Sequence, residues 1–410
     1  MASFFALATI VLAFLGPAAG AGKLYLFHVV ALAYGMISVV HWDEPASLSV
    51  VLRGTKLALV PLAMCAWFVV TLLWCPDVPQ GATYCVYIAC GVLATCAAAA
   101  YASGGARQCQ IVVIVLVFCA LGDVVVGLLE VATPFRLPCS VYWPGNPNFE
   151  DLQKMFPPDH QVWEVFDEMP TGFHGNPNTY ATVLNLMLPF ALFLLRSWAA
   201  ALFAIAVVAL EVYAQSRIGV VTAGIILGLS TLFPVWKAGV RWAVLCLMAL
   251  AALVVLANAS GKDVIPNTED RSADSRRELI SNGLWALQES WGLGVGAGGD
   301  YAVQQELFRG DFLVVPMHNY WIELLVNGGV VFFVVYLLWY LALCWRMAKI
   351  AYGYEPGSFE AKAGAAACVS LVAFIPGVVT CSSAIYLLPM WLFLGFCIGL
   401  INTVEHSGAS

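Results

Sequence analysis

The residues best suited to chemistry lie in and beside one long polar stretch, residues 259–317, which ends at His318 and gives way to an apolar segment. The chain is 61% hydrophobic and 10% charged, so we expect the reacting groups where so many polar residues gather. At this predicted loop-to-helix junction, a neutral imidazole could accept a proton from a hydroxyl group at a membrane surface. A histidine at a helix start also commonly serves as a cap or an interface residue, and its position alone leaves both interpretations open.

Asn319 and Glu323 follow on the apolar segment. Their spacing of four residues places them on one helix face, so the Glu323 carboxylate could orient the Asn319 amide or, less directly, His318. Both are candidate substrate-binding residues.

Inside the polar stretch, Ser272 to Ser275 offer N-caps for a helix that runs to about Ser290. One face of this helix is predicted to carry Ile280, Leu284, Leu287 and Trp291, and Arg276 shares that face. Arg276 should therefore point inward, whereas Arg277 falls on a more polar face. A surface ion pair of Arg276 with Glu269 or Asp270 is the alternative, and Arg277 is kept as a candidate substrate-binding residue.

Gly292 to Gly299 come next and superficially match a nucleotide-binding glycine fingerprint. Neither a preceding strand nor a following βαβ unit is predicted, so we interpret this segment as a flexible surface turn.

Arg217 lies between two apolar segments with almost no loop, in the sequence Gln215-Ser216-Arg217. A guanidinium at the apolar edge of a bilayer is costly unless it finds an anion or a water-filled cavity. Snorkelling to lipid phosphate explains its position equally well.

A further polar stretch, residues 132–178, closes with Gly172-Phe173-His174-Gly175-Asn176-Pro177-Asn178, in which turn-forming residues dominate. We interpret this closing segment as a tight turn at the membrane surface, with direct substrate contact as the alternative. Asn178 is a candidate for substrate binding, or for capping the next helix through its side-chain oxygen.

These candidates need a scaffold, and the remaining sequence predicts an all-α integral membrane protein. Long apolar runs separated by short charged breaks are typical of a polytopic membrane protein. We predict about twelve transmembrane helices, at residues 4–20, 24–40, 56–75, 82–101, 110–131, 179–195, 198–215, 218–234, 241–258, 319–345, 363–380 and 384–402. For the first of them, a signal peptide cleaved near Ala18 to Ala21 is the alternative.

Lysine and arginine set the predicted orientation. With a cytoplasmic N-terminus, the short inner loops hold nine of these residues and the short outer loops hold only Lys23 and Arg217. Both termini are then cytoplasmic and both long loops extracytoplasmic, the second with an amphipathic helix. The predicted parts are residues 1–131 (five helices), 132–178 (first loop), 179–258 (helices six to nine), 259–317 (large loop) and 318–410 (three helices).

Composition narrows the chemistry further. A net charge of −7, with an acidic excess in both long loops, argues against nucleic acid as a partner. Most of the thirteen cysteines fall inside predicted spans, where a thiol packs as a small apolar group, although Cys75 and Cys85 flank a short turn and could pair. No cysteine and histidine spacing typical of a metal site is present.

Three stretches make the chain similar to the O-antigen ligase and polymerase superfamily of cell-surface polysaccharide enzymes. They are Gln215 to Gly219, Asp274 to Leu279 with the following Gly292 to Gly298, and His318 to Gly329. The resemblance covers residues 179–345 well and the N-terminal spans only by number and hydropathy. After Gly329 this chain has Val330, at a position where members of the family often show a further glycine.

The resemblance implies a metal-independent glycosyltransferase without a cofactor, embedded in the bacterial cytoplasmic membrane. Its donor would be a glycan on a polyprenyl diphosphate, such as undecaprenyl diphosphate, and its acceptor a glycan or glycolipid such as lipopolysaccharide, on the outer face. By this resemblance Arg217 and Arg276 would bind the diphosphate, and His318 would assist the acceptor hydroxyl. Bidentate contacts to phosphate oxygens suit arginine better than lysine.

Two other functions stay open. A polymerase of the same family would extend one lipid-linked glycan with another and needs the same grip on the donor. A twelve-span secondary transporter is less favoured because no internal repeat is visible, although Asp123, Glu130 and Glu211 could form a proton path.

Overall fold

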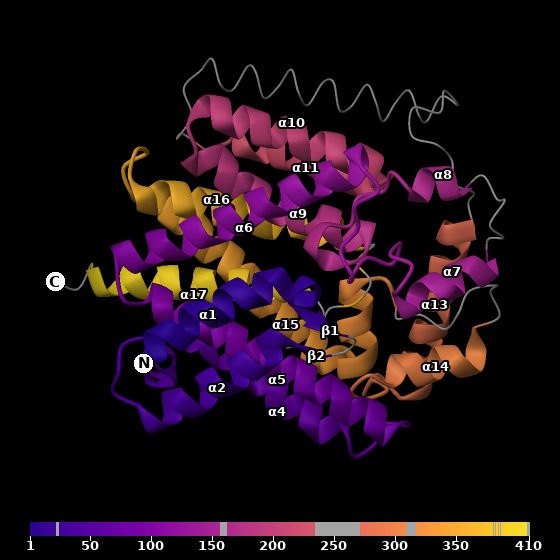
Figure 1. Cartoon of the computed structure of the whole chain (residues 1–410). Helices are drawn as coiled ribbons and strands as arrows, with labels where there is room; N and C mark the ends of the chain where they lie inside the picture. The colour runs from indigo at the N-terminus through magenta and orange to yellow at the C-terminus, as the bar shows by residue number, and fades with distance from the viewer. Residues whose placement is uncertain are drawn as a thin grey trace.

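The computed structural model describes residues 1–21, 24–155, 162–233, 271–308, 317–379 and 387–407, together with the single residues 381, 383 and 385. Figure 1 shows a bundle of helices with one small hairpin. The N-terminal helices are α1 (Ala2–Leu15), α2 (Leu26–Val40), α3 (Leu48–Arg53), α4 (Leu59–Thr71), α5 (Val78–Ala102) and α6 (Ala106–Ala132). The first long loop holds α7 (Pro147–Met155) and α8 (Val162–Phe166).

The C-terminal part begins with α9 (Pro177–Leu194), α10 (Ser197–Tyr213) and α11 (Arg217–Ser230). The large loop contributes α13 (Arg271–Glu289) and α14 (Gly299–Leu307), and the chain ends with α15 (Tyr320–Gly353), α16 (Phe359–Gly377) and α17 (Leu388–Ser407). Three short 3₁₀ turns are η1 (Gly16–Ala19), η2 (Lys56–Ala58) and η3 (Gly172–His174), and strands β1 (Gly20–Ala21) and β2 (Leu24–Tyr25) form the antiparallel hairpin.

The bundle has two distinct ends. In Figure 1 both termini lie at one end, and the loop helices α7, α8, α13 and α14 lie at the other. The loop helices therefore project away from the termini. Which end faces the cytoplasm remains a prediction of the positive-inside rule.

Within the described residues, six helices are long and apolar enough to cross a membrane, and four shorter apolar helices accompany them. Each predicted span outside residues 241–258 contains a described helix, whereas 241–258 lies outside the described residues. The chain is thus a multi-pass helical membrane protein, and the number twelve stays a prediction.

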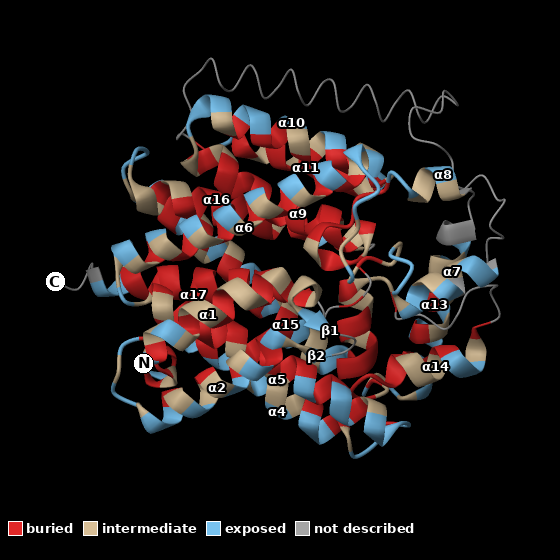
Figure 2. Cartoon of the chain, viewed as in Figure 1, coloured by how far each residue is buried: buried red, intermediate tan, exposed pale blue. Residues whose placement is uncertain are grey.

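Figure 2 shows exposed residues, in pale blue, along the outer helices, and many of the exposed residues of the chain have large apolar side chains. Phe118 on α6 and Val331 on α15 are each 76% exposed, and Leu338 on α15 is 62% exposed. Such extensive apolar surface is unfavourable in water and is what a helix facing lipid presents.

The centre of the bundle is built on small residues, which allow helix backbones to approach closely without help from the hydrophobic effect. Helix α5 packs along α17, where a Cβ on Gly399 would lie 2.8 Å from the Ala99 carbonyl oxygen. Thr95 Oγ1 donates across this contact to the Trp391 carbonyl (2.9 Å). This rigid pair forms the support behind α15.

The possible pairing of Cys75 with Cys85 is wrong, because every described cysteine is a free thiol. The Cys75 thiol donates instead to the Ala297 carbonyl (3.2 Å), and the Cys85 thiol to the Phe68 carbonyl (3.3 Å). The first of these bonds ties the end of α4 to the large loop.

Candidate functional site

Helix α13 positions Arg276. Its predicted end near Ser290 agrees with the observed Glu289, whereas the helix already includes Ser272 to Ser275, the residues that were predicted to cap it. Its buried side chains are Leu279, Gly283, Ala286 and Leu287. The predicted inward residues Leu284 and Trp291 are instead 42% and 94% exposed, so this part of the prediction is wrong. The face is rotated because Gly283, too small to count as an apolar anchor in the pattern, lets α13 approach Met317 and Val326 closely.

Arg276 and Arg277 have different surroundings on this helix. Arg276 is half-buried, whereas Arg277 is exposed and its Nη1 donates to Asp274 Oδ1 (3.2 Å) one turn earlier. Burial lowers the pKa of the Arg276 guanidinium from its ordinary value. Among the described residues no carboxylate pairs with Arg276, and the alternative partners Glu269 and Asp270 lie outside them.

The glycine-rich segment Gly292 to Gly299 is not a flexible surface turn, and this prediction is wrong. It packs against a break in α15, where Gly329 has φ 82° and ψ 168°. Val295 N donates to the Val326 carbonyl (2.8 Å), Gly296 N to the Asn327 carbonyl (3.2 Å), and Val330 N to the Gly292 carbonyl (2.8 Å). The loop thus supplies hydrogen bonds that the broken helix lacks, which is how irregular backbone is tolerated at a membrane.

Glycine is required in this contact for two reasons. Gly292, Gly294, Gly296 and Gly298 all have positive φ values, between 64° and 86°, which L side chains rarely adopt. The backbones also approach closely, since a Cβ on Gly294 would lie 2.6 Å from Gly329 N. The segment resembles a nucleotide-binding fingerprint because a nucleotide-binding turn and this contact with α15 both require glycine.

We therefore expect Gly294→Ala to lower the free energy of unfolding by about 2 kcal/mol or more, because it adds both backbone strain and a steric overlap. Gly353→Ala is the matched control, since no heavy atom lies within 4 Å of its Cβ. Thermal unfolding of both variants in the same detergent measures the difference. Equal melting temperatures for the two variants would contradict the docked loop.

Helix α14 connects the parts of the site, a role that the sequence did not reveal. The buried Asp300 accepts hydrogen bonds from Asn327 Nδ2 (3.0 Å) and from the Met317 backbone N–H, and its own N–H donates to Asn327 Oδ1 (3.0 Å). One turn later, Gln304 Nε2 donates to the Leu279 carbonyl on α13 (2.8 Å). Two side chains of α14 thus hold the helix that carries Arg276 and the residue before His318.

His318 lies in the turn that enters α15. Its backbone has φ 47°, a conformation that is uncommon for a residue with a side chain and is often found at functional sites. Asn319 caps the helix, because its Oδ1 accepts from Trp321 N (3.1 Å) and Ile322 N (3.2 Å). The capping role considered for His318 therefore belongs to Asn319, and the imidazole has no hydrogen-bond partner among the described residues.

His318 and Arg276 interact directly through their charges. Desolvation by the surrounding protein lowers the pKa of His318 from 6.5 to about 4, and the positive charge of Arg276 contributes to this lowering. Near neutral pH the half-buried imidazole is therefore neutral beside a guanidinium. The pair offers a proton acceptor and a fixed cation in one place.

Arg217 begins α11 directly after a tight turn. Gln215 has φ 52°, and Ser216 Oγ accepts from Gly219 N (3.2 Å) as the N-cap. Asn185 on α9 supports the same turn, because its Nδ2 donates to the Gly219 carbonyl (3.0 Å). These bonds leave the Arg217 side chain exposed at the end of the bundle.

The end of α16 links Arg217 to the start of α15. Trp321 Nε1 donates to the Ile375 carbonyl (3.0 Å), and a Cβ on Gly377 would lie 3.0 Å from Thr222 Cγ2 in α11. Since Thr222 follows Arg217 by little more than one helical turn, all three site residues lie toward the same end of the bundle. Arg276 and His318 interact directly, whereas Arg217 belongs to α11, which packs against α16.

Asn178 is not the cap of the helix it begins. Asn176 Oδ1 accepts from Asn178 N (2.9 Å) and Thr179 N (3.3 Å), with Pro177 at the first helical position. Proline is favoured at that position because its missing N–H would have no helical acceptor there. The cap therefore lies two residues earlier than predicted, and the Asn178 side chain is half-buried.

Glu323 faces the interior of the bundle. Its Oε1 accepts from Tyr84 Oη (3.1 Å) on α5 and from Ser383 Oγ (3.0 Å) in the connection between α16 and α17. The Asn319 amide oxygen is occupied by the helix cap. The expectation that Glu323 orients Asn319 is therefore wrong, because spacing alone does not reveal that α5 offers a closer donor.

The closing turn of the first long loop is held by two buried carboxylates of α6. Glu130 accepts from Thr171 N (2.6 Å) and Gly172 N (2.8 Å), and Asp123 accepts from Phe173 N (2.8 Å) and His174 Nε2 (3.1 Å). These contacts agree with a tight turn. They also give Asp123 and Glu130 a structural role, whereas the proton path considered for them stays untested.

The described residues contain no group of three or more His, Cys, Asp or Glu side chains placed to hold a metal ion. The site thus consists of two arginines, one neutral histidine and the polar groups that position them.

Comparison with known proteins gives two matches. Residues 183–337 match the family model described as O-Antigen ligase, and this stretch contains Arg217, Arg276 and His318. The chain is also 22% identical, over 409 aligned residues, to the teichuronic acid biosynthesis protein TuaE of Bacillus subtilis (strain 168), which covers 94% of this chain and 80% of that protein. No solved structure matches the chain.

Proposed function

We propose, from the similarity of residues 183–337 to the O-antigen ligase family model, that this chain transfers a glycan from a polyprenyl diphosphate to a hydroxyl group of an acceptor. As a multi-pass protein of cell-surface polysaccharide biosynthesis, it would work at the outer face of the bacterial cytoplasmic membrane, with both termini in the cytoplasm. The loops 132–178 and 259–317 would then be extracytoplasmic. The donor and the acceptor glycan or glycolipid are the expected partners.

The observation that carries this proposal is the pair formed by Arg276 and His318. A half-buried guanidinium without a described carboxylate partner favours an anionic ligand, because a buried cation needs a compensating charge. Its neighbour is an imidazole that stays unprotonated at neutral pH. A diphosphate and a hydroxyl group are the reactants that such a pair suits.

In the proposed reaction, His318 takes the proton of the acceptor hydroxyl as its oxygen attacks the anomeric carbon of the donor sugar. The bond between that carbon and the diphosphate oxygen breaks, and the electron pair leaves with the diphosphate. Arg276 and Arg217 would neutralise the charge that builds on the leaving group, which is where fixed cations are most effective. Asp300 and Gln304 would act as positioning residues for this arrangement.

The second candidate function is polymerisation, in which the acceptor is another lipid-linked glycan. The similarity to a protein named for teichuronic acid biosynthesis favours it, since that name refers to the making of a cell-surface polymer. Both functions use the same donor site and differ only in the acceptor.

The test is transfer by the purified full-length chain in lipid nanodiscs, with a lipid-linked repeat unit supplied alone or with a separate glycolipid acceptor. Longer lipid-linked chains from the donor alone would indicate a polymerase, and transfer only in the presence of the second acceptor would indicate a ligase. Uptake of substrate into sealed vesicles without any covalent product would overturn both and favour a transporter.

A further inference from the structure

Three buried polar side chains below the turn that holds Arg217 have oxygens without a hydrogen-bond donor. Asn185 on α9 is 4% exposed, and the bond from its Nδ2 to the Gly219 carbonyl fixes the orientation of the amide. A carbonyl can only accept, so the amide nitrogen must face Gly219 and Oδ1 must face away. Asn185 Oδ1 is buried and has no partner in the described chain.

Glu211 on α10 lies beside Asn185 and is fully buried. Both of its carboxylate oxygens are buried, and neither accepts a hydrogen bond from the described residues. An unpaired carboxylate is among the least favourable groups to bury in a membrane protein, and such residues usually mark an ion or proton site.

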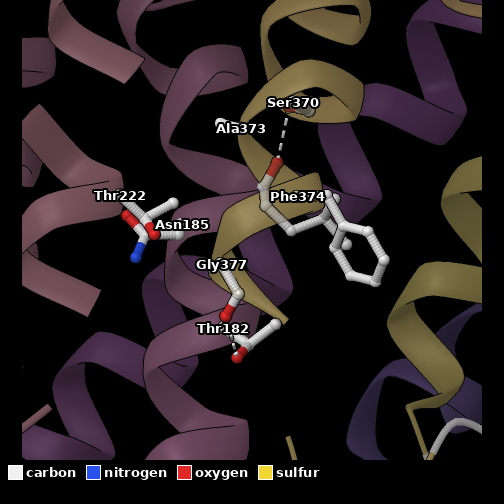
Figure 3. A pocket seen from close by; sticks show the side chains of 8 residues that line it. Thr182, Asn185, Thr222, Ser370, Ala373, Phe374 and Gly377 are labelled. Carbon is white, nitrogen blue, oxygen red and sulfur yellow. Dashed lines mark hydrogen bonds between the residues drawn. The ribbon is translucent and has the colours of Figure 1, made fainter. Parts of the chain in front are cut away.

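Thr222 on α11 supplies the next oxygen, since its Oγ1 is buried without a partner among the described residues and the residue is 1% exposed. Together with Asn185, Thr182 and Ser370 it lines a cavity of about 10 Å³ between α9, α11 and α16. In Figure 3 the side chains of Asn185 and Thr222 converge on the same side of this cavity. The space is enough for one water molecule or one small ion.

The other polar groups of the cavity already have partners. Ser370 Oγ donates to the Leu186 carbonyl (2.8 Å), and Thr182 Oγ1 lies within hydrogen-bonding distance of the Gly377 carbonyl (3.3 Å), as the dashed lines in Figure 3 show. Thr182 Oγ1 also contacts the Asn178 carbonyl (2.9 Å). The cluster of Glu211, Asn185 and Thr222 is therefore rich in acceptor oxygens, and none of the described residues brings a positive charge to it. Hard oxygen atoms with one net negative charge are the ligands of a small monovalent cation or of a proton.

We propose that Glu211, Asn185 and Thr222 form a buried site for a single positive charge, supplied by Na⁺ or by a proton. Among the described residues, the titratable groups that face Glu211 from neighbouring elements are Tyr180 on α9 and, beyond it, Asp123 and Glu130 on α6. Both of these carboxylates hold the turn of residues 171–174. The site lies directly below the first turn of α11, so its occupancy would stabilise the support of Arg217.

The experiment measures the melting temperature of the full-length chain in detergent, first in Na⁺ against choline at constant ionic strength and pH, then from pH 5 to pH 8 without Na⁺. A ligand that binds only the folded state raises its stability with concentration. We expect the melting temperature of the wild type to rise with Na⁺, or to fall as the pH rises because the folded state must hold a proton that the unfolded chain releases. A rise with Na⁺ would identify the bound charge as Na⁺, and a fall with rising pH would identify it as a proton.

Glu211→Gln is expected to lose this dependence, because it keeps the shape and removes the charge. Glu211→Leu serves the same comparison if the glutamine variant does not accumulate. Ser230→Ala is the matched control, since Ser230 Oγ on α11, the helix of Thr222, is also buried without a partner among the described residues but lies outside the cluster, and this variant should respond as the wild type does. Identical responses of the wild type and the Glu211 variants to both Na⁺ and pH would overturn the proposal.

Discussion

Arg276→Ala is expected to lower the rate of glycan transfer by about 100-fold to 1000-fold while the protein still folds and inserts, because it removes a fixed cation from the leaving diphosphate. Arg276 is half-buried beside His318 and has no described carboxylate partner whose loss would unfold the helix. The measurement is the initial rate of transfer from the lipid-linked donor, normalised to protein in the membrane fraction. Arg276→Lys should recover only part of the activity, since a lysine cannot form the bidentate contact.

Arg277→Ala is the matched control for this experiment. Arg277 is the next residue on the same helix, with the same charge, but it is exposed and pairs with Asp274. An exposed pair of this kind contributes at most about 1 kcal/mol to stability, so this variant should keep most of its activity. If Arg277→Ala lost activity and Arg276→Ala kept it, the assignment of the two arginines would be reversed.

The adjacent arginines also show how far the sequence could go. Helical periodicity correctly predicted that Arg276 is the more buried of the two, although it misplaced the buried face. Apolar periodicity is read from large side chains, whereas α13 receives the side chains of Met317 and Val326 at Gly283. A glycine leaves no large residue to mark this contact, so a pattern of apolar residues misplaces the buried face.

The contacts that position His318 could not be predicted from spacing. Asp300 and Asn327 are 27 residues apart and belong to different helices, and their reciprocal hydrogen bonds form only because the glycine-rich loop docks into the break of α15. That break depends on Gly329, whose positive φ cannot be inferred from the identity of a glycine alone. The residue types of the site could be found in the sequence, whereas the support that holds them depends on tertiary structure.

Glu211 also shows that the sequence does not reveal the partners of a buried residue. Glu211 and Glu130 look alike in the sequence, as single acids at or near the end of an apolar run. In the fold, Glu130 receives three hydrogen bonds from Thr171 and Gly172, and Glu211 receives none from the described residues. Whether a membrane carboxylate is structural or binds a ligand depends on these donors, which come from distant parts of the chain.

His318→Ala is expected to lower the transfer rate by about 100-fold to 10,000-fold, the usual contribution of a general base. Asn319 caps α15 and Asp300 holds Met317, so the helix start does not depend on the imidazole and the variant should fold. Transfer assays on variant protein with an unchanged melting temperature measure the effect. Full activity of His318→Ala would remove this residue from the mechanism.

The pH dependence separates a base from a residue that only fills space. Because the pKa of His318 is lowered from 6.5 to about 4, the imidazole should stay neutral, and able to accept a proton, from pH 8 down to about pH 5. Its modification by diethyl pyrocarbonate, which attacks the neutral ring, can be followed in the peptide that contains His318 and should be half-suppressed near pH 4. Since the positive charge of Arg276 contributes to the lowering, Arg276→Gln should move this midpoint upward, and Arg277→Gln should leave it unchanged. A modification midpoint at pH 6.5 in the wild type, or the same midpoint in the wild type and Arg276→Gln, would show that Arg276 and His318 do not form the coupled pair on which the mechanism depends.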